Sequence, residues 1–181
     1  RASKNEKFAV YPYLHDRIHS KGQLAFLAAC GVKTILLSES STTTFSYFSS
    51  YQYNAHAFTV ELGKVRPFGQ NDMRRFEDAK QAITQLITQT EYAPTVDMDD
   101  LDIYRVNQVI NRNEEQFTLH FDDDTPNFTD YPKGTVLASE PGKEYIAEQD
   151  GEAIVFPNAK VAIGQRALLT VVPTTLDKLD V

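Results

Sequence analysis

The clearest structural signal in the sequence lies at residues 21–37, which read Lys-Gly-Gln-Leu-Ala-Phe-Leu-Ala-Ala-Cys-Gly-Val-Lys-Thr-Ile-Leu-Leu. Apolar residues recur at helical spacing within 21–29, which predicts an amphipathic helix. Gly31 follows at the position where many helices end in a left-handed residue. The apolar run 32–37 then predicts a strand that is covered on both faces, as in parallel sheets.

The segments on either side continue this alternation of strands and helices. Residues 7–11 predict a strand that Pro12 ends, and residues 57–62 predict another that Gly63 closes. A second helix should begin near Asn71–Asp72. Its apolar stripe consists of Met73, Phe76, Ile83, Leu86 and Ile87. Short connections between these elements indicate an α/β layer with a mostly parallel sheet.

The second half of the chain differs in character. Residues 93–100 combine a proline with several acidic residues and predict a linker. Strand-like alternation with period two then occurs in 102–111, 116–122, 134–139, 144–148, 153–156 and 166–172. We therefore predict two domains: residues 1–93 form an α/β domain, and residues 94–181 form a small antiparallel β domain, a barrel or sandwich of about six strands.

Composition excludes several functional classes. The 181 residues carry a formal net charge of -7 at pH 7, without a block of Lys and Arg, so the surface is unsuited to a nucleic-acid backbone. The longest apolar runs are far shorter than the roughly 20 residues that cross a bilayer. Cys30 is the only cysteine, which fits a reducing compartment. We therefore expect a cytoplasmic protein that binds neither nucleic acid nor a membrane.

The histidines and acidic clusters give weak evidence for a metal site. His15 and His19 stand four residues apart, but no Glu follows the first histidine as in helical zinc motifs, and Pro12 argues against a helix there. The acidic cluster 97–102 lacks the Gly and the terminal Glu of a calcium loop, and 122–124 precedes a turn, so we interpret both as solvated. The sequence therefore predicts no metal ligand in this chain.

Two segments are candidates for a binding or catalytic site. Residues 38–50 alternate hydroxyl and aromatic side chains directly after a buried strand, which predicts either a ligand-binding loop or a merely polar surface loop. Glu61 ends an apolar strand, where its carboxylate is expected to project over the carboxyl edge of the sheet, beside that loop. There it could act as a catalytic base. The alternative is a polar residue that only marks the end of a strand.

Several motifs occur together along the chain: Thr-Phe-Ser-Tyr-Phe-Ser at 44–49, Glu-Leu-Gly-Lys at 61–64 and Pro-Phe-Gly-Gln-Asn-Asp at 67–72. Residues 8–12 and 164–167 agree with the same pattern. Together these motifs resemble the succinylglutamate desuccinylases, in the aspartoacylase branch of the zinc carboxypeptidase superfamily. The resemblance implies the C-terminal half of a carboxypeptidase-like, mostly parallel sheet with helices, followed by a small antiparallel β domain.

The resemblance also implies an activity. Members of this family hydrolyse N-succinyl-L-glutamate to succinate and L-glutamate in arginine catabolism, using a zinc-bound water. Glu61 matches the family's glutamate that takes a proton from this water and passes it to the leaving amine. The implied cofactor is Zn²⁺, and the implied partner is a small-molecule N-acyl amino acid substrate.

Two departures from the family pattern limit what this chain could do alone. The family binds zinc through a His-x-x-Glu pair and a later His in an Asp-Leu-His segment, and neither motif occurs here. The resemblance places these ligands upstream of Arg1, so we expect the chain alone to be inactive. Tyr51 stands where the family carries an Arg that holds a substrate carboxylate. Tyr51 is thus the candidate for substrate binding, without a bidentate charged clamp.

Two alternative functions stay open. One is aspartoacylase-like hydrolysis of another N-acyl amino acid, and the other is a non-catalytic binding or structural domain derived from such an enzyme. Strands missing from the sheet would leave an open edge and apolar faces exposed. We therefore also expect self-association, or pairing with the missing N-terminal segment.

Overall fold

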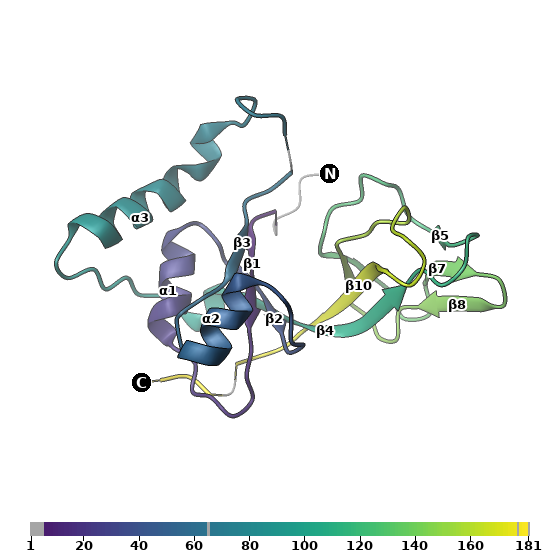
Figure 1. Cartoon of the computed structure of the whole chain (residues 1–181), viewed down its shortest axis with the longest axis horizontal. Coiled ribbons are helices and arrows are strands. Elements are labelled where there is room, and N and C mark those ends of the chain that lie inside the picture. Colours follow the sequence, from purple (N-terminus) through teal and green to yellow (C-terminus); the bar gives the residue numbers. More distant parts are fainter. Residues whose placement is uncertain (1–5, 65, 177, 181) are drawn as a thin grey trace. The chain divides into compact units, whose positions relative to one another are not determined.

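The computed structural model describes residues 6–64, 66–176 and 178–180. These residues form two compact units (Figure 1). One comprises Glu6–Ile103 together with the C-terminal segment from Thr175, and the other comprises Tyr104–Thr174. The proposed domain boundary between residues 93 and 94 stays a prediction.

A small sheet lies at the centre of the first unit. Its strands are β1 (Phe8–Pro12), β2 (Thr34–Ser38) and β3 (Thr59–Glu61). β1 runs parallel to β2 and antiparallel to β3, so β1 is the middle strand of the three. β4 (Asp102–Asn111) begins in this unit, where the Asp102 N–H donates to the Lys33 carbonyl oxygen at 2.9 Å, and continues into the second unit.

Helix α1 (Lys21–Ala29) connects the two parallel strands and confirms the helix predicted for this segment. Its Leu24 and Leu27 are fully buried and pack against alternate residues of β1 and β2, among them Tyr11 and Leu37. The helix ends as its sequence predicts, because Gly31 adopts a left-handed φ of 73° and its N–H donates to the carbonyl oxygen of residue 28 at 2.9 Å.

Gly31→Ala should destabilise the chain for two reasons. A Cβ at Gly31 would lie 2.7 Å from Asp78 Oδ2 and 3.3 Å from Asp78 Cβ, and alanine disfavours the positive φ. Gly69→Ala is the matched control, because Gly69 has a φ of 79° with nothing within 4 Å of its Cβ position. In urea denaturation we expect losses of about 1–2 kcal/mol for the control and about 1 kcal/mol more at Gly31. Equal losses would contradict the contact with Asp78.

Helix α2 (Phe45–Tyr53) occupies much of the segment that was expected to be a loop. Thr44 caps its N-terminus, since its side chain accepts a hydrogen bond from the Tyr47 N–H at 3.3 Å, and Asn54 ends it with a left-handed φ of 53°. The loop interpretation of residues 38–50 is therefore wrong from residue 45 onward. The sequence predicts this helix only weakly because serine and aromatic residues have only middling helix propensity.

Helix α3 (Glu77–Thr88) follows the 3₁₀ turn η1 (Met73–Phe76), and Asp72 caps that turn close to the predicted start. Its burial differs from the usual pattern of an amphipathic helix. The buried residues of the helix are Ala79 and Ala82, which pack on the core around α1, whereas its large apolar side chains are exposed. No helix in the described part of the chain is long and apolar enough to span a membrane.

The segment predicted to be a linker packs on the first unit. It contains the 3₁₀ turn η2 (Met98–Asp100), and the side chains of Val96 and Met98 lie against the core around α1. An Asp97 side-chain oxygen caps the turn by accepting from the Asp99 N–H at 3.1 Å. The acidic residues therefore lie on the outer side of a partly buried connection.

The C-terminal segment lies beside the residues that lead into α1. His19 and Leu179 form a parallel bridge. The His19 N–H donates to the Lys178 carbonyl oxygen at 2.7 Å, and the Asp180 N–H donates to the His19 carbonyl oxygen at 2.9 Å. Asp180 Oδ1 in turn accepts from the Lys21 N–H at 2.5 Å. Both ends of the described sequence thus contribute to the first unit.

The second unit consists of antiparallel strands around its own core, which includes Ile110, Leu137, Ile154 and Leu168. β10 pairs with β4 and β9, β6 pairs with β9, and β7 pairs with β5 and β8. The bounds are β5 (Thr118–Leu119), β6 (Thr129–Tyr131), β7 (Val136–Glu140), β8 (Lys143–Ile146), β9 (Glu152–Val155) and β10 (Arg166–Pro173). The predicted fold class, an α/β layer followed by a small antiparallel β domain, is confirmed.

Candidate active site

The pairing of β3 with β1 fixes the position of Glu61. Because β3 runs antiparallel to β1, Glu61 lies opposite Phe8, the first residue of β1. Pro12 and Ser38 mark the other end, where β1 and β2 finish side by side. Glu61 therefore stands at the amino end of the parallel pair. The expectation that it projects over the carboxyl edge is wrong, because a reversed strand brings its last residue to the opposite end.

Glu61 nevertheless shares one face of β3 with residues that contact α2. Side chains alternate along a strand, so Thr59 and Glu61 point to one side and Val60 to the other. Val60 packs against the core around α1, so Thr59 and Glu61 face away from that core. Thr59 Oγ1 lies 3.0 Å from Ser46 Oγ in the first turn of α2. Glu61 follows Thr59 by two residues, about 7 Å along the strand.

The carboxylate of Glu61 is half-buried and has no hydrogen-bond or ion-pair partner among the described residues. Two residues later, Gly63 turns the chain with a φ of 118°. Glu6 and Arg75 form an ion pair beside this turn, and the hydrogen bond from Arg75 lowers the pKa of Glu6. Arg75 is thus already neutralised by Glu6, and Glu61 keeps a carboxylate that is available for other chemistry.

Tyr51 lies on α2 and points in a different direction from Ser46. Five positions separate the two residues, which is about 140° around a helix. The Tyr51 side chain is 56% exposed, and its ring stacks on that of Tyr47 with centroids 5.6 Å apart. The structure therefore leaves the Tyr51 phenol accessible to a ligand.

An open hollow of about 590 Å³ lies over the N-terminal part of α2, within the size range of ligand pockets. Its lining mixes hydroxyls with aromatic rings: Ser41, Thr42, Thr43, Thr44, Phe45, Tyr47, Phe48, Tyr51 and Gln52. Some hydroxyls bond one another, as Thr42 Oγ1 and Thr44 Oγ1 do at 2.8 Å. The alternation of hydroxyls and aromatic rings in the sequence thus builds a capped helix beside a hollow.

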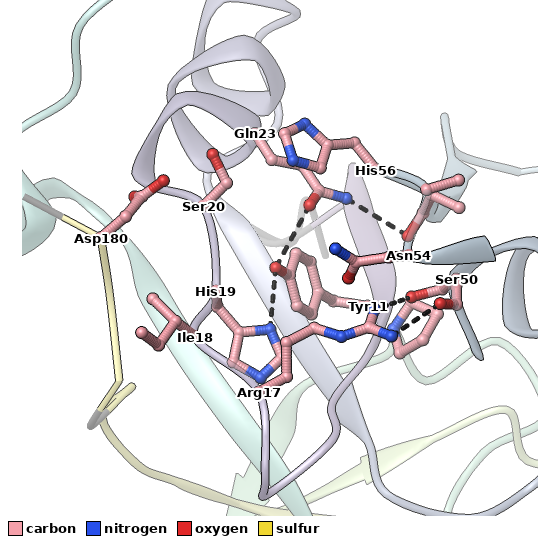
Figure 2. A pocket seen from close by; sticks show the side chains of 13 residues that line it. Tyr11, Arg17, Ile18, His19, Ser20, Gln23, Ser50, Asn54, His56 and Asp180 are labelled. Atoms are coloured by element: carbon pink, nitrogen blue, oxygen red, sulfur yellow. Dashed lines mark hydrogen bonds between the residues drawn. The ribbon is translucent and has the colours of Figure 1, made fainter. Parts of the chain in front are cut away.

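A second, smaller cavity lies at the carboxyl end of β1 and was missed by sequence reasoning. It has a volume of about 100 Å³ and a largely polar lining (Figure 2). Its polar residues are Tyr11, Arg17, His19, Ser20, Gln23, Ser50, Asn54, His56 and Asp180. Arg17 donates to both Ser50 Oγ (2.9 Å) and the Ser50 carbonyl oxygen (2.7 Å). No local motif predicts this cavity, because its lining comes from both ends of the chain.

A buried hydrogen-bond network forms one wall of this cavity (Figure 2). Tyr11 Oη lies 3.1 Å from His19 Nδ1 and 3.3 Å from Gln23 Oε1. His19 Nε2 lies 3.2 Å from the Leu14 carbonyl oxygen, which can only accept, so Nε2 carries the proton. Burial raises the pKa of Tyr11 to about 12 and lowers the pKa of His19. Both groups are therefore uncharged near pH 7.

The described residues do not fit a zinc site. They contain no group of three or more His, Cys, Asp and Glu side chains that could hold a metal ion. His15 Nε2 lies 3.3 Å from Glu39 Oε2 at the surface, whereas His19 is buried in the network described above. The cluster Asp122–Asp124 is exposed. Any zinc chemistry would therefore need ligands from outside this part of the chain.

Comparison with known protein families gives two consecutive matches. The model of the succinylglutamate desuccinylase/aspartoacylase catalytic domain matches residues 1–87, and that of the AstE/AspA barrel-sandwich hybrid domain matches residues 99–174. A succinylglutamate desuccinylase of Pseudoalteromonas atlantica is 62% identical over 178 residues, which are 98% of this chain and 51% of that protein. One of Idiomarina loihiensis is 53% identical, over 99% of this chain and 53% of that protein.

Solved structures of relatives agree with these sequence matches. The succinylglutamate desuccinylase of Vibrio cholerae superposes with a TM-score of 0.84 at 36% identity and covers 98% of this chain and 53% of that one. The Vibrio parahaemolyticus protein gives 0.81 at 39% identity, over 96% and 51%. The chain thus spans about half the length of the relatives it matches. From these matches, this chain belongs to the succinylglutamate desuccinylase/aspartoacylase family.

Proposed function

We propose that this chain is part of a zinc-dependent amidohydrolase that cleaves N-succinyl-L-glutamate into succinate and L-glutamate in arginine catabolism. The observation that supports this most is the 62% identity to the Pseudoalteromonas atlantica succinylglutamate desuccinylase. Hydrolysis of another N-acyl amino acid is the second candidate, because the matching catalytic-domain family also includes aspartoacylases. A cytoplasmic location fits the buried, unpaired thiol of Cys30.

We assign the role of general base to Glu61. As a water oxygen attacks the amide carbonyl carbon, the Glu61 carboxylate takes a proton from that water. When the carbon–nitrogen bond breaks, Glu61 gives this proton to the amine nitrogen, which leaves as the amino group of glutamate. One carboxylate can do both because the steps are sequential. The half-buried side chain without a partner among the described residues supports this role.

The zinc ligands of the proposed enzyme lie in the part of the relatives' length that this chain does not span. The family resemblance puts the last of them a few residues before the position of Arg1. The chain runs into β1 at Phe8, and Glu61 lies opposite Phe8. A ligand that precedes β1 would therefore enter the sheet at the end where Glu61 stands. Without these ligands, we propose that the 181-residue chain is inactive.

Tyr51 is proposed to bind a carboxylate of the substrate. Its phenol is exposed and contributes to the hollow over α2, whose first turn contacts the face of β3 that carries Glu61. A phenol donates one hydrogen bond and cannot form the paired, charged contact of an arginine. The negative charge of the substrate carboxylate would then be neutralised by cationic groups other than Tyr51.

A chimera tests the proposal. These 181 residues replace the matching region of the Pseudoalteromonas atlantica protein, and the purified chimera and the chain alone are assayed with N-succinyl-L-glutamate and N-acetyl-L-aspartate. We expect the chimera to prefer the succinyl substrate by at least about tenfold in kcat/KM and to lose its activity when a zinc chelator is added. We expect the chain alone to be inactive. A preference for the acetyl substrate would favour the second candidate. Zinc-dependent activity of the chain alone would contradict its proposed inactivity.

A further inference from the structure

The small polar cavity at the carboxyl end of β1 contains an arginine that is not paired with a carboxylate. Arg17 lines this cavity and is half-buried. Its guanidinium donates to Ser50, to Oγ at 2.9 Å and to the carbonyl oxygen at 2.7 Å (Figure 2). Both acceptors are neutral, and Arg17 forms no ion pair with the described residues. Arg17 therefore keeps its full positive charge inside a confined space.

The two bonds to Ser50 hold the guanidinium in a fixed orientation. Ser50 is buried and lies in the last turn of α2, where backbone carbonyl oxygens lack helical partners and attract a cation. Nη1 and Nη2 each use one N–H on Ser50, and the Nε–H has no acceptor among the described residues. The Nε–H and the neighbouring Nη–H form a planar fork that matches the two oxygens of a carboxylate.

Other polar side chains reach the same space without making hydrogen bonds of their own. Asn54 ends α2 with a left-handed φ of 53°, and its amide lines the cavity, as does the ring of His56 (Figure 2). Neither side chain has a hydrogen-bond partner among the described residues. The Ser20 hydroxyl also lines the cavity and does not cap α1. An amide N–H and a hydroxyl are thus available to donate to an anion beside Arg17.

The size and charge of the cavity select a small, singly charged ligand. Its volume of about 100 Å³ is roughly three times the 30 Å³ that one water molecule occupies in the liquid. Arg17 is the one Lys or Arg in the lining and Asp180 the one acidic residue, whose Oδ1 accepts from the Lys21 N–H. Tyr11 and His19 in the wall are uncharged near pH 7. One cation beside one carboxylate favours a monoanion over an anion of higher charge.

We propose that this cavity binds a small monocarboxylate, whose two oxygens pair with the Nε–H and Nη–H of Arg17 and whose outer oxygen lone pairs accept from the Asn54 amide. The cavity includes Pro12, the last residue of β1, whereas Glu61 lies opposite Phe8, the first residue. The proposed ligand therefore occupies a different end of the sheet from the proposed base. The inference does not depend on the proposed hydrolase activity.

A titration of the ¹⁵N-labelled chain with sodium acetate tests this proposal, with ionic strength held constant by sodium chloride. Acetate should shift the backbone amide resonances of Ala55 and His56 saturably, with a Kd of about 1–10 mM. Arg17→Gln should weaken binding by at least about tenfold, because it removes the charge and the fork. Arg105→Gln, which replaces an exposed arginine of the second unit, is the matched control and should bind within about twofold of wild type.

A second variant separates binding from folding, because Arg17→Gln also removes the contacts with Ser50. Asn54→Gly suits the left-handed backbone and removes only the amide, so it should keep the wild-type circular dichroism and bind acetate at least about threefold more weakly. Sodium phosphate should also bind more weakly than acetate, since its second charge would face Asp180. The absence of a saturable shift, unchanged affinity in either variant, or phosphate binding as tight as that of acetate would each overturn the proposal.

Discussion

Glu61→Gln, introduced into the chimera, should lower kcat on N-succinyl-L-glutamate by about 10²–10⁴-fold. Glutamine keeps the size of the side chain and its ability to hydrogen-bond, but its amide cannot take a proton from water. KM should change by less than about threefold, because the lost interaction belongs to the transition state and not to substrate binding. Steady-state kinetics that follow the release of the reaction product succinate would measure both kcat and KM.

Two companion variants make this result specific. Glu61→Asp keeps the carboxylate but withdraws it by one methylene, so its kcat should fall between those of wild type and Glu61→Gln. Glu91→Gln removes an exposed carboxylate beyond the end of α3 and should leave kcat within twofold of wild type. A Glu61→Gln variant that keeps more than a tenth of the wild-type kcat would exclude Glu61 as the base.

The first strands and helix of the chain could be predicted because their signals are local. The apolar run in residues 32–37, the helical spacing in 21–29 and the positive φ required at Gly31 each depend on a few neighbouring residues. The burial of Leu24 and Leu27 follows directly from that spacing. Where periodicity, capping and burial agree, the sequence alone identifies the element and its buried face.

The position of Glu61 could not be predicted because it depends on the direction of β3. The sequence of a three-residue strand does not indicate whether the strand runs parallel or antiparallel to its neighbour. The pairing of Glu61 with Phe8 is a contact between residues far apart in the sequence. The rule that ligand sites lie at the carboxyl edge of a parallel sheet does not apply to β3, because β3 runs antiparallel to β1. The assignment of Glu61 as the base now depends on the family relationship and on its free carboxylate.

The small polar cavity illustrates the same limit. The four-residue spacing of His15 and His19 resembles that of a metal-binding pair, yet the partners of His19 are Tyr11 and the Leu14 carbonyl oxygen. Asp180 completes the lining from the other end of the chain. Only the folded arrangement of β1, α1 and the C-terminal segment brings these groups together, so no spacing rule applied to the sequence could have identified them.

In the second unit, Glu152 is a carboxylate with 0% exposure, at the start of β9. Its Oε1 accepts from Asn107 Nδ2 at 3.0 Å and from Gln108 Nε2 at 2.7 Å, and its Oε2 accepts from the Glu148 N–H at 2.6 Å. The Thr170 hydroxyl donates as well. Burial raises the pKa of Glu152, but these hydrogen bonds more than offset that effect and lower it overall. The buried side chain is therefore ionised and held by neutral donors.

Glu152→Gln should destabilise the second unit by about 3 kcal/mol at pH 7. A glutamine offers one accepting oxygen where the carboxylate offers two, and its NH₂ group would face a donor. At least one buried donor would lose its partner as a result. Urea denaturation followed by circular dichroism measures the loss. Glu144→Gln, an exposed glutamate on β8, is the matched control and should change the free energy of unfolding by less than about 0.5 kcal/mol.

The pH dependence of this difference identifies its electrostatic origin. The pKa of Glu152 is lower in the folded chain than its ordinary value of 4.5, so the folded state binds fewer protons there than the unfolded state. The stabilisation from this group is complete above about pH 4.5 and is lost as the pH falls through the lowered pKa. Wild type should therefore lose stability below pH 4.5 faster than Glu152→Gln, and the gap between them should narrow. A gap that stays constant with pH would show that Glu152 stabilises the unit by its shape alone, because only an ionised carboxylate responds to protons in this way.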